Sequence, residues 1–140
     1  MRAFVLDASV ALAWFVDDPV PPYAVQVREA IVNGKKALVP GLWALEMANG
    51  LLMAERRGKL TAVEVDYGLR QLEVVVAAGI EIDTVAVPAI RDAFAPAHAH
   101  QLTAYDAVYL GLARRERLPL ATLDKSLRAA AAKVGIHAMS

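Results

Sequence analysis

The sequence predicts an α/β protein with a mostly parallel sheet. The chain has 140 residues, 57% of them hydrophobic, enough for one domain that buries roughly two-thirds of its unfolded surface. Short apolar runs bounded by turn residues recur along it, and helical segments lie between them. Because strands that alternate with helices favour β-α-β units, we expect a three-layer α/β/α sandwich formed by residues 1–140 as a single domain.

The N-terminal segment is predicted to form a strand and two helices. Residues 3–6 (AFVL) are an apolar run suited to a buried strand, and the sequence DASVALAWFV continues as a helix. The stretch DDPVPP at 17–22 ends that helix, and its last two prolines can open the next one. Gly34 is expected to close this second helix.

A second buried strand is predicted at residues 37–40 (ALVP), followed by a helix that stops near Gly58. Thr61 and Glu64 have the spacing of a capping box. They predict that a further helix begins there and runs to about Ala78.

The next part of the chain is predicted as strand, short helix, loop and helix. Residues 80–85 (IEIDTV) alternate in polarity, which is typical of a strand with one wetter face. A short helix is expected around 88–95, and 96–101 (PAHAHQ) is expected to be a loop. The segment LTAYDAVYLGLA that follows is predicted to be the helix carrying Asp106.

The C-terminal part is predicted to hold a buried strand at 118–122 (LPLAT) and a helix that ends at Gly135. A small last strand is expected at 136–139 (IHAM).

Four acidic residues occupy related positions in this scheme. Asp7 and Asp124 each follow a predicted strand, and Glu46 and Asp106 lie in the first turns of predicted helices. In open parallel sheets, ligands bind beyond the carboxyl ends of the strands. We therefore expect the four carboxylates to converge there, provided that their strands are neighbours.

Each acid also has a simpler explanation. Asp7 and Asp124 could act only as helix N-caps, a common role of aspartate, and Glu46 could be solvated on a helix face. Asp106 is harder to explain, because its neighbours three and four positions away include no cation and its surroundings are apolar.

Convergence of the acids has an energetic cost that a cation would remove. Two carboxylates ~5 Å apart repel by about 3 kcal/mol at an effective dielectric near 20. Oxygen ligands without cysteine favour a hard divalent ion, Mg²⁺ or Mn²⁺. Such sites commonly act on phosphates, and one or two ions can support phosphodiester hydrolysis.

The composition of the chain limits which ligands, covalent chemistry and membrane association are possible. Fifteen basic and fifteen acidic residues give no global positive field, so any nucleic-acid contact would be local. The absence of cysteine excludes disulfides and thiolate chemistry. No segment approaches the ~20 uninterrupted apolar residues of a membrane span, and we expect a soluble cytoplasmic protein.

The segments VLDAS, Glu46-x-x-Asn49, LTAYDAVYLGLA and LPLATLDKSL together resemble the PIN-domain nucleases, more narrowly the VapC-type toxins of toxin–antitoxin pairs. The match runs in the family's order from Asp7 to Asp124. The resemblance implies a PIN-like α/β/α fold and Mg²⁺- or Mn²⁺-dependent endoribonuclease activity.

The resemblance also implies roles for particular residues. It assigns the catalytic, metal-binding site to four acids: Asp7, Glu46, Asp106 and Asp124. It places Ser9, Asn49 and Thr122 beside them, where they would orient carboxylates or water. Members of the family usually dimerise and are held inactive by a cognate antitoxin protein.

Substrate contacts are expected from Lys125 and Arg128, which follow Asp124 and are well placed to meet an RNA phosphate. Two other basic clusters, at 56–59 and 114–117, lie at helix C-terminal ends, where cations are favoured in any case.

Two other functions remain open at this point. An aspartyl-phosphate phosphohydrolase also places Asp after its first strand, but it normally has a second Asp two residues on, where this chain has Ser9. A non-catalytic RNA-binding or assembly module of the same fold would be expected to have lost one or more of the acids, and all four are present.

Overall fold

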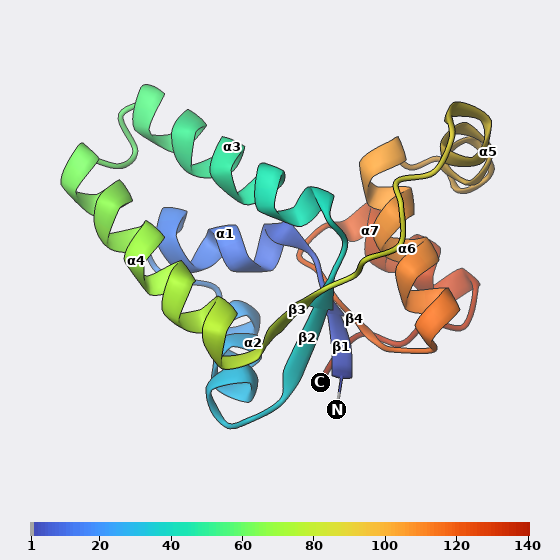
Figure 1. Ribbon diagram of the computed structural model, residues 1–140, viewed down its shortest axis with the longest axis horizontal. Helices are drawn as coiled ribbons and strands as arrows, with labels where there is room; N and C mark the ends of the chain where they lie inside the picture. The colour runs from blue at the N-terminus through green and yellow to red at the C-terminus, as the bar shows by residue number, and fades with distance from the viewer. Residues whose placement is uncertain (1) are drawn as a thin grey trace.

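A four-stranded parallel sheet with strand order β3-β2-β1-β4 forms the centre of the molecule (Figure 1). The computed structural model describes residues 2–140. The strands are β1 (Arg2–Leu6), β2 (Lys36–Val39), β3 (Ile80–Ile82) and β4 (Leu120–Ala121). The helices are α1 (Ala8–Val16), α2 (Pro22–Val32), α3 (Leu42–Arg56), α4 (Ala62–Gly79), α5 (Ile90–His100), α6 (Ala104–Glu116) and α7 (Lys125–Lys133).

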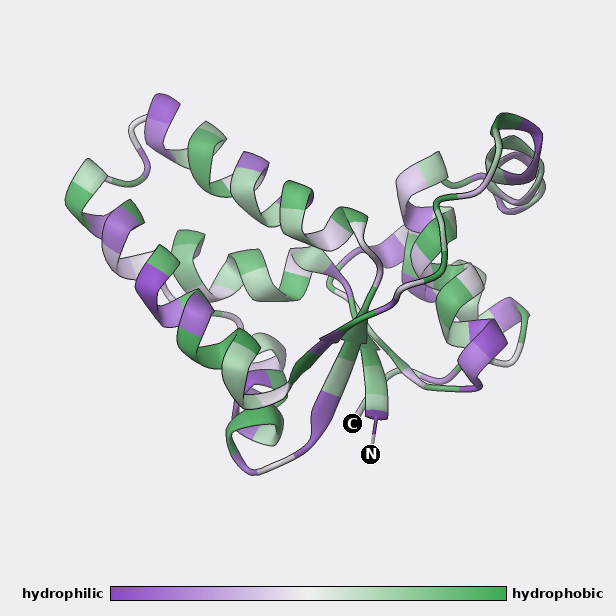
Figure 2. Cartoon of the chain, in the orientation of Figure 1, coloured by the Kyte–Doolittle hydropathy of each residue, from purple (hydrophilic) through white to green (hydrophobic). Residues whose placement is uncertain are grey.

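The helices form two groups around this sheet. Figure 1 shows α1 to α4 on one side and α5 to α7 on the other, which confirms the predicted three-layer arrangement. Both faces of the central strands are therefore covered, and Phe4, Val5 and Leu6 of β1 are fully buried. Figure 2 shows β1 and β2 as hydrophobic along most of their length, with hydrophilic residues where they begin.

Local sequence signals set most helix boundaries. Thr61 accepts from the Glu64 N–H while the Glu64 side chain accepts from the Thr61 N–H, so the predicted capping box is present at the start of α4. Gly34, Gly58 and Gly135 follow helices with positive φ, as a residue without a Cβ does most easily.

Three predicted elements differ from the structure. The strand predicted at 80–85 ends at Ile82, although the Asp83 N–H still bonds to the Val39 carbonyl. The strand predicted at 118–122 is reduced to Leu120–Ala121, where the Val5 N–H bonds to the Pro119 carbonyl and the Asp7 N–H to the Ala121 carbonyl. The last strand is only a single bridge between Leu120 and Ala138.

The prediction of a loop at 96–101 was wrong. These residues continue α5 to His100, with Pro96 inside the helix, and the chain turns at Gln101 with φ 56°. Alanines around the proline favour helix. Phe94 also stacks on His98 one turn later, with ring centroids 5.5 Å apart.

The strand order creates a site at the carboxyl edge of the sheet. The chain passes from β1 outward to β2 and β3, and then returns to place β4 on the other side of β1. The crevice at such a reversal is where open α/β sheets bind ligands. Here it separates Asp7, directly after β1, from Asp124, three residues after β4.

Within residues 2–140 no helix has the length and apolar character needed to cross a membrane.

The fold makes a paired prediction about two glycines. A Cβ on Gly79 would lie 2.9 Å from Ile31 Cγ2 and 3.1 Å from the Lys35 carbonyl oxygen, so Gly79→Ala should lower the free energy of unfolding by about 1–3 kcal/mol. A Cβ on Gly111, at an exposed position of α6, meets no atom within 4 Å, so Gly111→Ala should raise the free energy of unfolding by roughly 0.4–1 kcal/mol. Urea unfolding of both variants measures this, and a loss of stability in both would contradict the packing.

Candidate active site

Four carboxylates from four separate elements face one another at the carboxyl edge of the sheet. Asp7 follows β1, Asp124 begins α7, Glu46 lies in the second turn of α3 and Asp106 in the first turn of α6. Their charges interact: Asp7 raises the pKa of Glu46 and Asp106, and Asp124 raises the pKa of Asp7 and Asp106. The four acids therefore lie near enough to one another for their charges to interact.

Asp7 is the most deeply buried of these acids, with 4% of its surface exposed. Its Oδ2 accepts two short hydrogen bonds, from Ser9 Oγ at 2.6 Å and from Thr122 Oγ1 at 2.7 Å. Asp7 occupies the N-cap position of α1 but its side chain does not cap that helix. Helix capping therefore does not explain why an aspartate occupies this position.

The two hydroxyls also fix the neighbouring backbone. Ser9 Oγ accepts from the Leu123 N–H at 3.0 Å, and Thr122 Oγ1 accepts from the Asp124 N–H at 3.0 Å. Each hydroxyl therefore donates to Asp7 and accepts from the segment that leads from β4 into α7. This network links the ends of β1 and β4 and places Asp124 beside Asp7.

Glu46 is oriented by a residue that we did not predict. The fully buried Tyr109 donates its hydroxyl to Glu46 Oε1 at 2.6 Å, joining α6 to α3 across the site. Burial and the neighbouring Glu46 carboxylate raise the pKa of Tyr109 well above its ordinary value, so the hydroxyl remains a donor. Its sequence signal was its place one helical turn after Asp106, on the same face of α6.

The two remaining acids sit at helix starts. Thr103 caps α6 by accepting from the Asp106 N–H at 3.1 Å, which places Asp106 in the first turn. Asp124 caps α7 through Oδ1, which accepts from the Leu127 N–H at 2.8 Å. The N-cap role considered for Asp124 is therefore real, and the site uses a residue that also begins a helix.

Burial raises the pKa of three of the acids. Desolvation is the main cause for Asp7, Glu46 and Asp106, and repulsion from the other acids adds to it in each case. Hydrogen bonds from Ser9 and Thr122 oppose the shift at Asp7, and the Tyr109 hydroxyl opposes it at Glu46. The site therefore holds ionised carboxylates at an energetic cost.

No cation of the described residues forms an ion pair that would offset this cost. Among residues 2–140, none of the four acids forms an ion pair with Lys, Arg or His. The side-chain hydrogen bonds of Asp7 and Glu46 use one carboxylate oxygen each, which leaves Oδ1 and Oε2 without a side-chain donor in the described chain. Oriented carboxylates with an open oxygen are suitable ligands for a hard cation.

The donor set fits Mg²⁺ or Mn²⁺ in an open site rather than in a closed cage. Within residues 2–140, no group of three or more acidic or histidine side chains could hold a metal ion as it stands. Mg²⁺ is usually held by one or two carboxylates, and waters and substrate phosphates complete its shell. Acids whose charges interact but that do not form a complete cage fit that manner of binding.

The other predicted residues differ in how closely they approach the site. Ser9 and Thr122 contact Asp7 as expected, whereas Asn49 is exposed and has no side-chain hydrogen bond among residues 2–140. Arg128 donates to the Thr122 carbonyl at 2.6 Å and lies over the Tyr23 ring, 5.2 Å from its centroid. Lys125 is exposed at the start of α7.

Residues 4–133 match the model of the PIN domain family. The chain therefore belongs to the PIN domain family.

Two known proteins resemble the chain, one in sequence and one in fold. It is 33% identical over 123 residues to ribonuclease VapC3 of Pyrobaculum aerophilum, an alignment that covers 88% of this chain and 90% of that protein. Its structure resembles the crystal structure of PAE2754 from Pyrobaculum aerophilum, with a TM-score of 0.67 at 24% identity. That match covers 92% of this chain and 84% of PAE2754, and it shows a shared fold.

The hydroxyl network makes a prediction about stability. Thr122→Val keeps the shape of the buried side chain but removes the donor to Asp7 and the acceptor for the Asp124 N–H. We expect the free energy of unfolding to fall by about 1–3 kcal/mol, since buried polar groups lose their partners. The same change at exposed Thr84 should cost no more than about 0.5 kcal/mol in urea unfolding, and equal losses would contradict the network.

The raised pKa of Asp106 makes a prediction about pH. Because its pKa lies above the ordinary 3.8, the fold disfavours the ionised form. The stability that the protonated group provides is complete below pH 3.8 and is lost as pH rises through the folded pKa. In EDTA, Asp106→Asn should therefore melt at a higher temperature than the unsubstituted protein at pH 8, with the difference shrinking towards pH 4. A difference that does not change with pH would contradict the repulsion.

Proposed function

We propose that this protein is a Mg²⁺- or Mn²⁺-dependent endoribonuclease and the toxin of a toxin–antitoxin pair. The observation that carries the proposal is the acidic crevice, in which carboxylates raise one another's pKa and no cation of the described chain neutralises them. Such a cluster needs a divalent ion, and divalent ions held by acids commonly act on phosphodiesters. The family and the ribonuclease name of the relative support RNA as substrate.

The four acids Asp7, Glu46, Asp106 and Asp124 would hold the metal. When bound, the ion would lower the pKa of a water molecule and stabilise the charge on the phosphate oxygens. Ser9 and Thr122 restrain Asp7 through Oδ2, so that its other oxygen keeps a constant direction. Tyr109 does the same for Glu46 through Oε1. This orientation before substrate arrives removes a reorganisation cost from the reaction.

The phosphate would be met at the edge of the crevice formed by the start of α7. Arg128 is exposed on α7, and contacts with the Thr122 carbonyl and the Tyr23 ring restrict the position of its guanidinium. Lys125 is exposed on the same turn. A held guanidinium and a mobile ammonium are suited to position an RNA phosphate and to screen it from the four carboxylates.

The partners follow from the same proposal. A toxin of this kind would be inhibited by a cognate antitoxin protein, would form a homodimer and would act on RNA in the cytoplasm. The VapC name of the relative supports the antitoxin. Exposed apolar residues support a surface for protein partners: Leu45, Val63, Tyr67 and Val74 on α3 and α4, and Ile90 and Phe94 on α5.

The two alternatives are less well supported. In a non-catalytic module the acids would have no role that compensates for their repulsion, yet Asp7 and Glu46 are each oriented by dedicated hydroxyls. In a phosphohydrolase that uses Asp7 as nucleophile, the residue two positions on would serve as acid and base. Here Ser9 occupies it and instead donates to Asp7 itself.

The decisive variant is Asp106→Asn, tested on RNA cleavage with Mn²⁺ present. It removes one charge of the cluster and keeps the side-chain shape, so cleavage should fall by at least about 100-fold. Asp92→Asn, on an exposed turn of α5, is the matched control and should cleave at the normal rate.

A metal titration separates loss of the ion from loss of the fold. Calorimetry should show weaker Mn²⁺ binding to Asp106→Asn, with the circular dichroism spectrum unchanged. Cleavage by Asp106→Asn at the rate of the Asp92→Asn control would overturn the assignment.

A further inference from the structure

A basic cavity lies at the end of the sheet opposite the acidic crevice. It has a volume of about 600 Å³ and is lined by Lys35, Arg114, Arg117 and His137 together with the first residues of β1. Volumes of this size are typical of small-molecule sites, which span about 300–1,000 Å³. From this end of β1 to Asp7 the strand covers about 15 Å at ~3.3 Å per residue, so the cavity and the crevice are separate.

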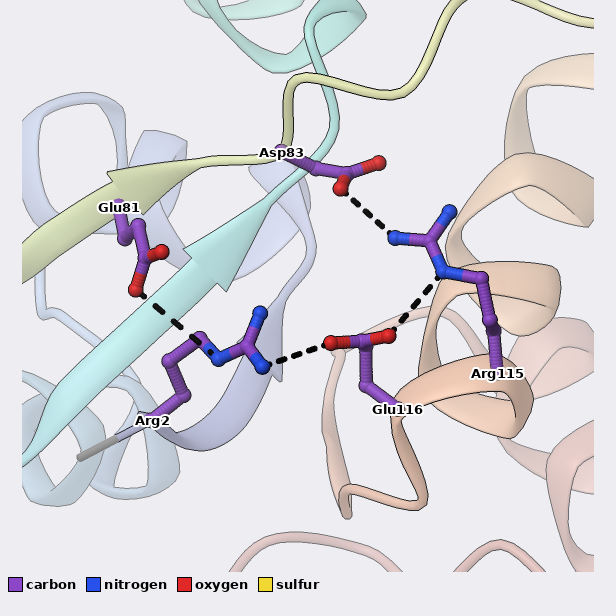
Figure 3. A network of polar contacts seen from close by, with 5 residues as sticks. All are labelled: Arg2, Glu81, Asp83, Arg115 and Glu116. Atoms are coloured by element: carbon purple, nitrogen blue, oxygen red, sulfur yellow. Dashed lines mark hydrogen bonds and ion pairs between the residues drawn. The ribbon is translucent and has the colours of Figure 1, made fainter.

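The basic residues of the cluster at 114–117 have different surroundings, because Arg115 forms ion pairs whereas Arg114 and Arg117 line the cavity. Figure 3 shows Arg115 engaged with Asp83 at 2.7 Å and with Glu116 at 3.1 Å, while Arg2 pairs with Glu116 at 2.8 Å. Arg115 is thus neutralised inside an ion-pair network. Arg114 and Arg117 line the cavity instead.

The cations of the cavity are not neutralised by the chain. Lys35, Arg114 and Arg117 form no ion pair among residues 2–140. Among residues 2–140, no Asp or Glu side chain lines the cavity, and the one acidic group in its lining is the terminal carboxylate of Ser140. Because Lys35, Arg114 and Arg117 outnumber that carboxylate, the hollow keeps a local positive field that attracts anions.

The walls of the cavity are held in place. The segment after α7 is bound to β4 by hydrogen bonds from Leu120 N–H to the His137 carbonyl and from Met139 N–H to the Leu120 carbonyl, both 3.0 Å. Tyr23 donates to the Met139 carbonyl at 2.8 Å from the other side. Arg117 ends α6 with φ 55°, where its backbone N–H bonds back to Ala113 and Arg114.

We propose that this cavity binds phosphate groups, carried either by a free nucleotide or by an RNA strand. The guanidinium groups of Arg114 and Arg117 present planar pairs of donors that match phosphate oxygens, and Lys35 adds a compact charge. A smaller cavity of about 210 Å³ shares His137 with the basic cavity and is also lined by Arg128 and by Thr122, the residue that donates to Asp7. An RNA strand that leaves the crevice past Arg128 would follow this path, and this second source rests on the proposed function.

The test compares two double variants with the same change in charge. Arg114→Gln with Arg117→Gln removes the two cavity guanidiniums, and Gln101 shows that glutamine adopts the left-handed conformation in this chain. Arg56→Gln with Arg57→Gln is the control, at the exposed end of α3. Binding of AMP and of a single-stranded RNA is measured for the full chain in EDTA, where no metal-dependent cleavage occurs.

Phosphate binding in the cavity predicts a selective loss. The cavity variant should bind at least about tenfold more weakly, since hydrogen bonds to charged groups are lost, and the control variant should bind normally. Loss of AMP binding identifies nucleotides as ligands. Loss of RNA binding alone, with the salt slope reduced by about 0.7 per phosphate contact, identifies the RNA strand.

Two results would overturn the proposal: no loss of affinity for either ligand in the cavity variant, or an equal loss in both variants, which would show only bulk charge. Thermal melting confirms that both variants are folded. The outcome is independent of the cleavage test, because AMP binding requires neither the acids nor a metal. A cavity that binds AMP in a protein that does not cleave RNA would refute the nuclease alone.

Discussion

The hydrogen bonds to the buried carboxylate of Asp7 are the interaction on which the site depends. Ser9 and Thr122 lie 113 residues apart in the chain, yet both donate to the same oxygen, Oδ2. The same hydroxyls accept from the backbone that leads into α7. A buried charge without such donors would cost several kcal/mol, so the ends of β1 and β4 must stay together for the fold to keep it. The strand pairing and the acidic crevice therefore stabilise each other's geometry.

The acidic site is also where the fold carries an electrostatic cost. Burial and mutual repulsion both oppose ionisation of Asp7, Glu46 and Asp106. By contrast, Arg2 at the start of β1 and Arg115 and Glu116 at the end of α6 form a network of ion pairs. Strained electrostatics at one place in a well-packed protein is typical of a functional site. At the opposite end of the sheet the uncompensated charges are positive, because cations without ion pairs in the described chain line a cavity there.

Much of the fold followed from local patterns, and the errors have local reasons. The capping box at Thr61 and the helix-ending glycines involve contacts within a few residues, so the sequence predicts them well. The strand at 80–85 was predicted too long, because an alternating pattern does not reveal that Asp83 turns away towards Arg115. A loop was predicted at 96–101 because Pro96 disfavours helix. The alanines around Pro96 favour helix more strongly than the prediction allowed.

The sequence by itself determined that four acids stand at the starts of helices or the ends of strands, and that Asp106 has no cation three or four residues away. Spacing along a helix or strand is enough for that, because it concerns neighbours in the chain. Only the tertiary structure decided that β4 lies beside β1, that Tyr109 reaches Glu46, and that Asn49 stays exposed. It also decided that Arg114 and Arg117 separate from Arg115. These outcomes depend on how helices rotate and pack against distant segments, which no local pattern specifies.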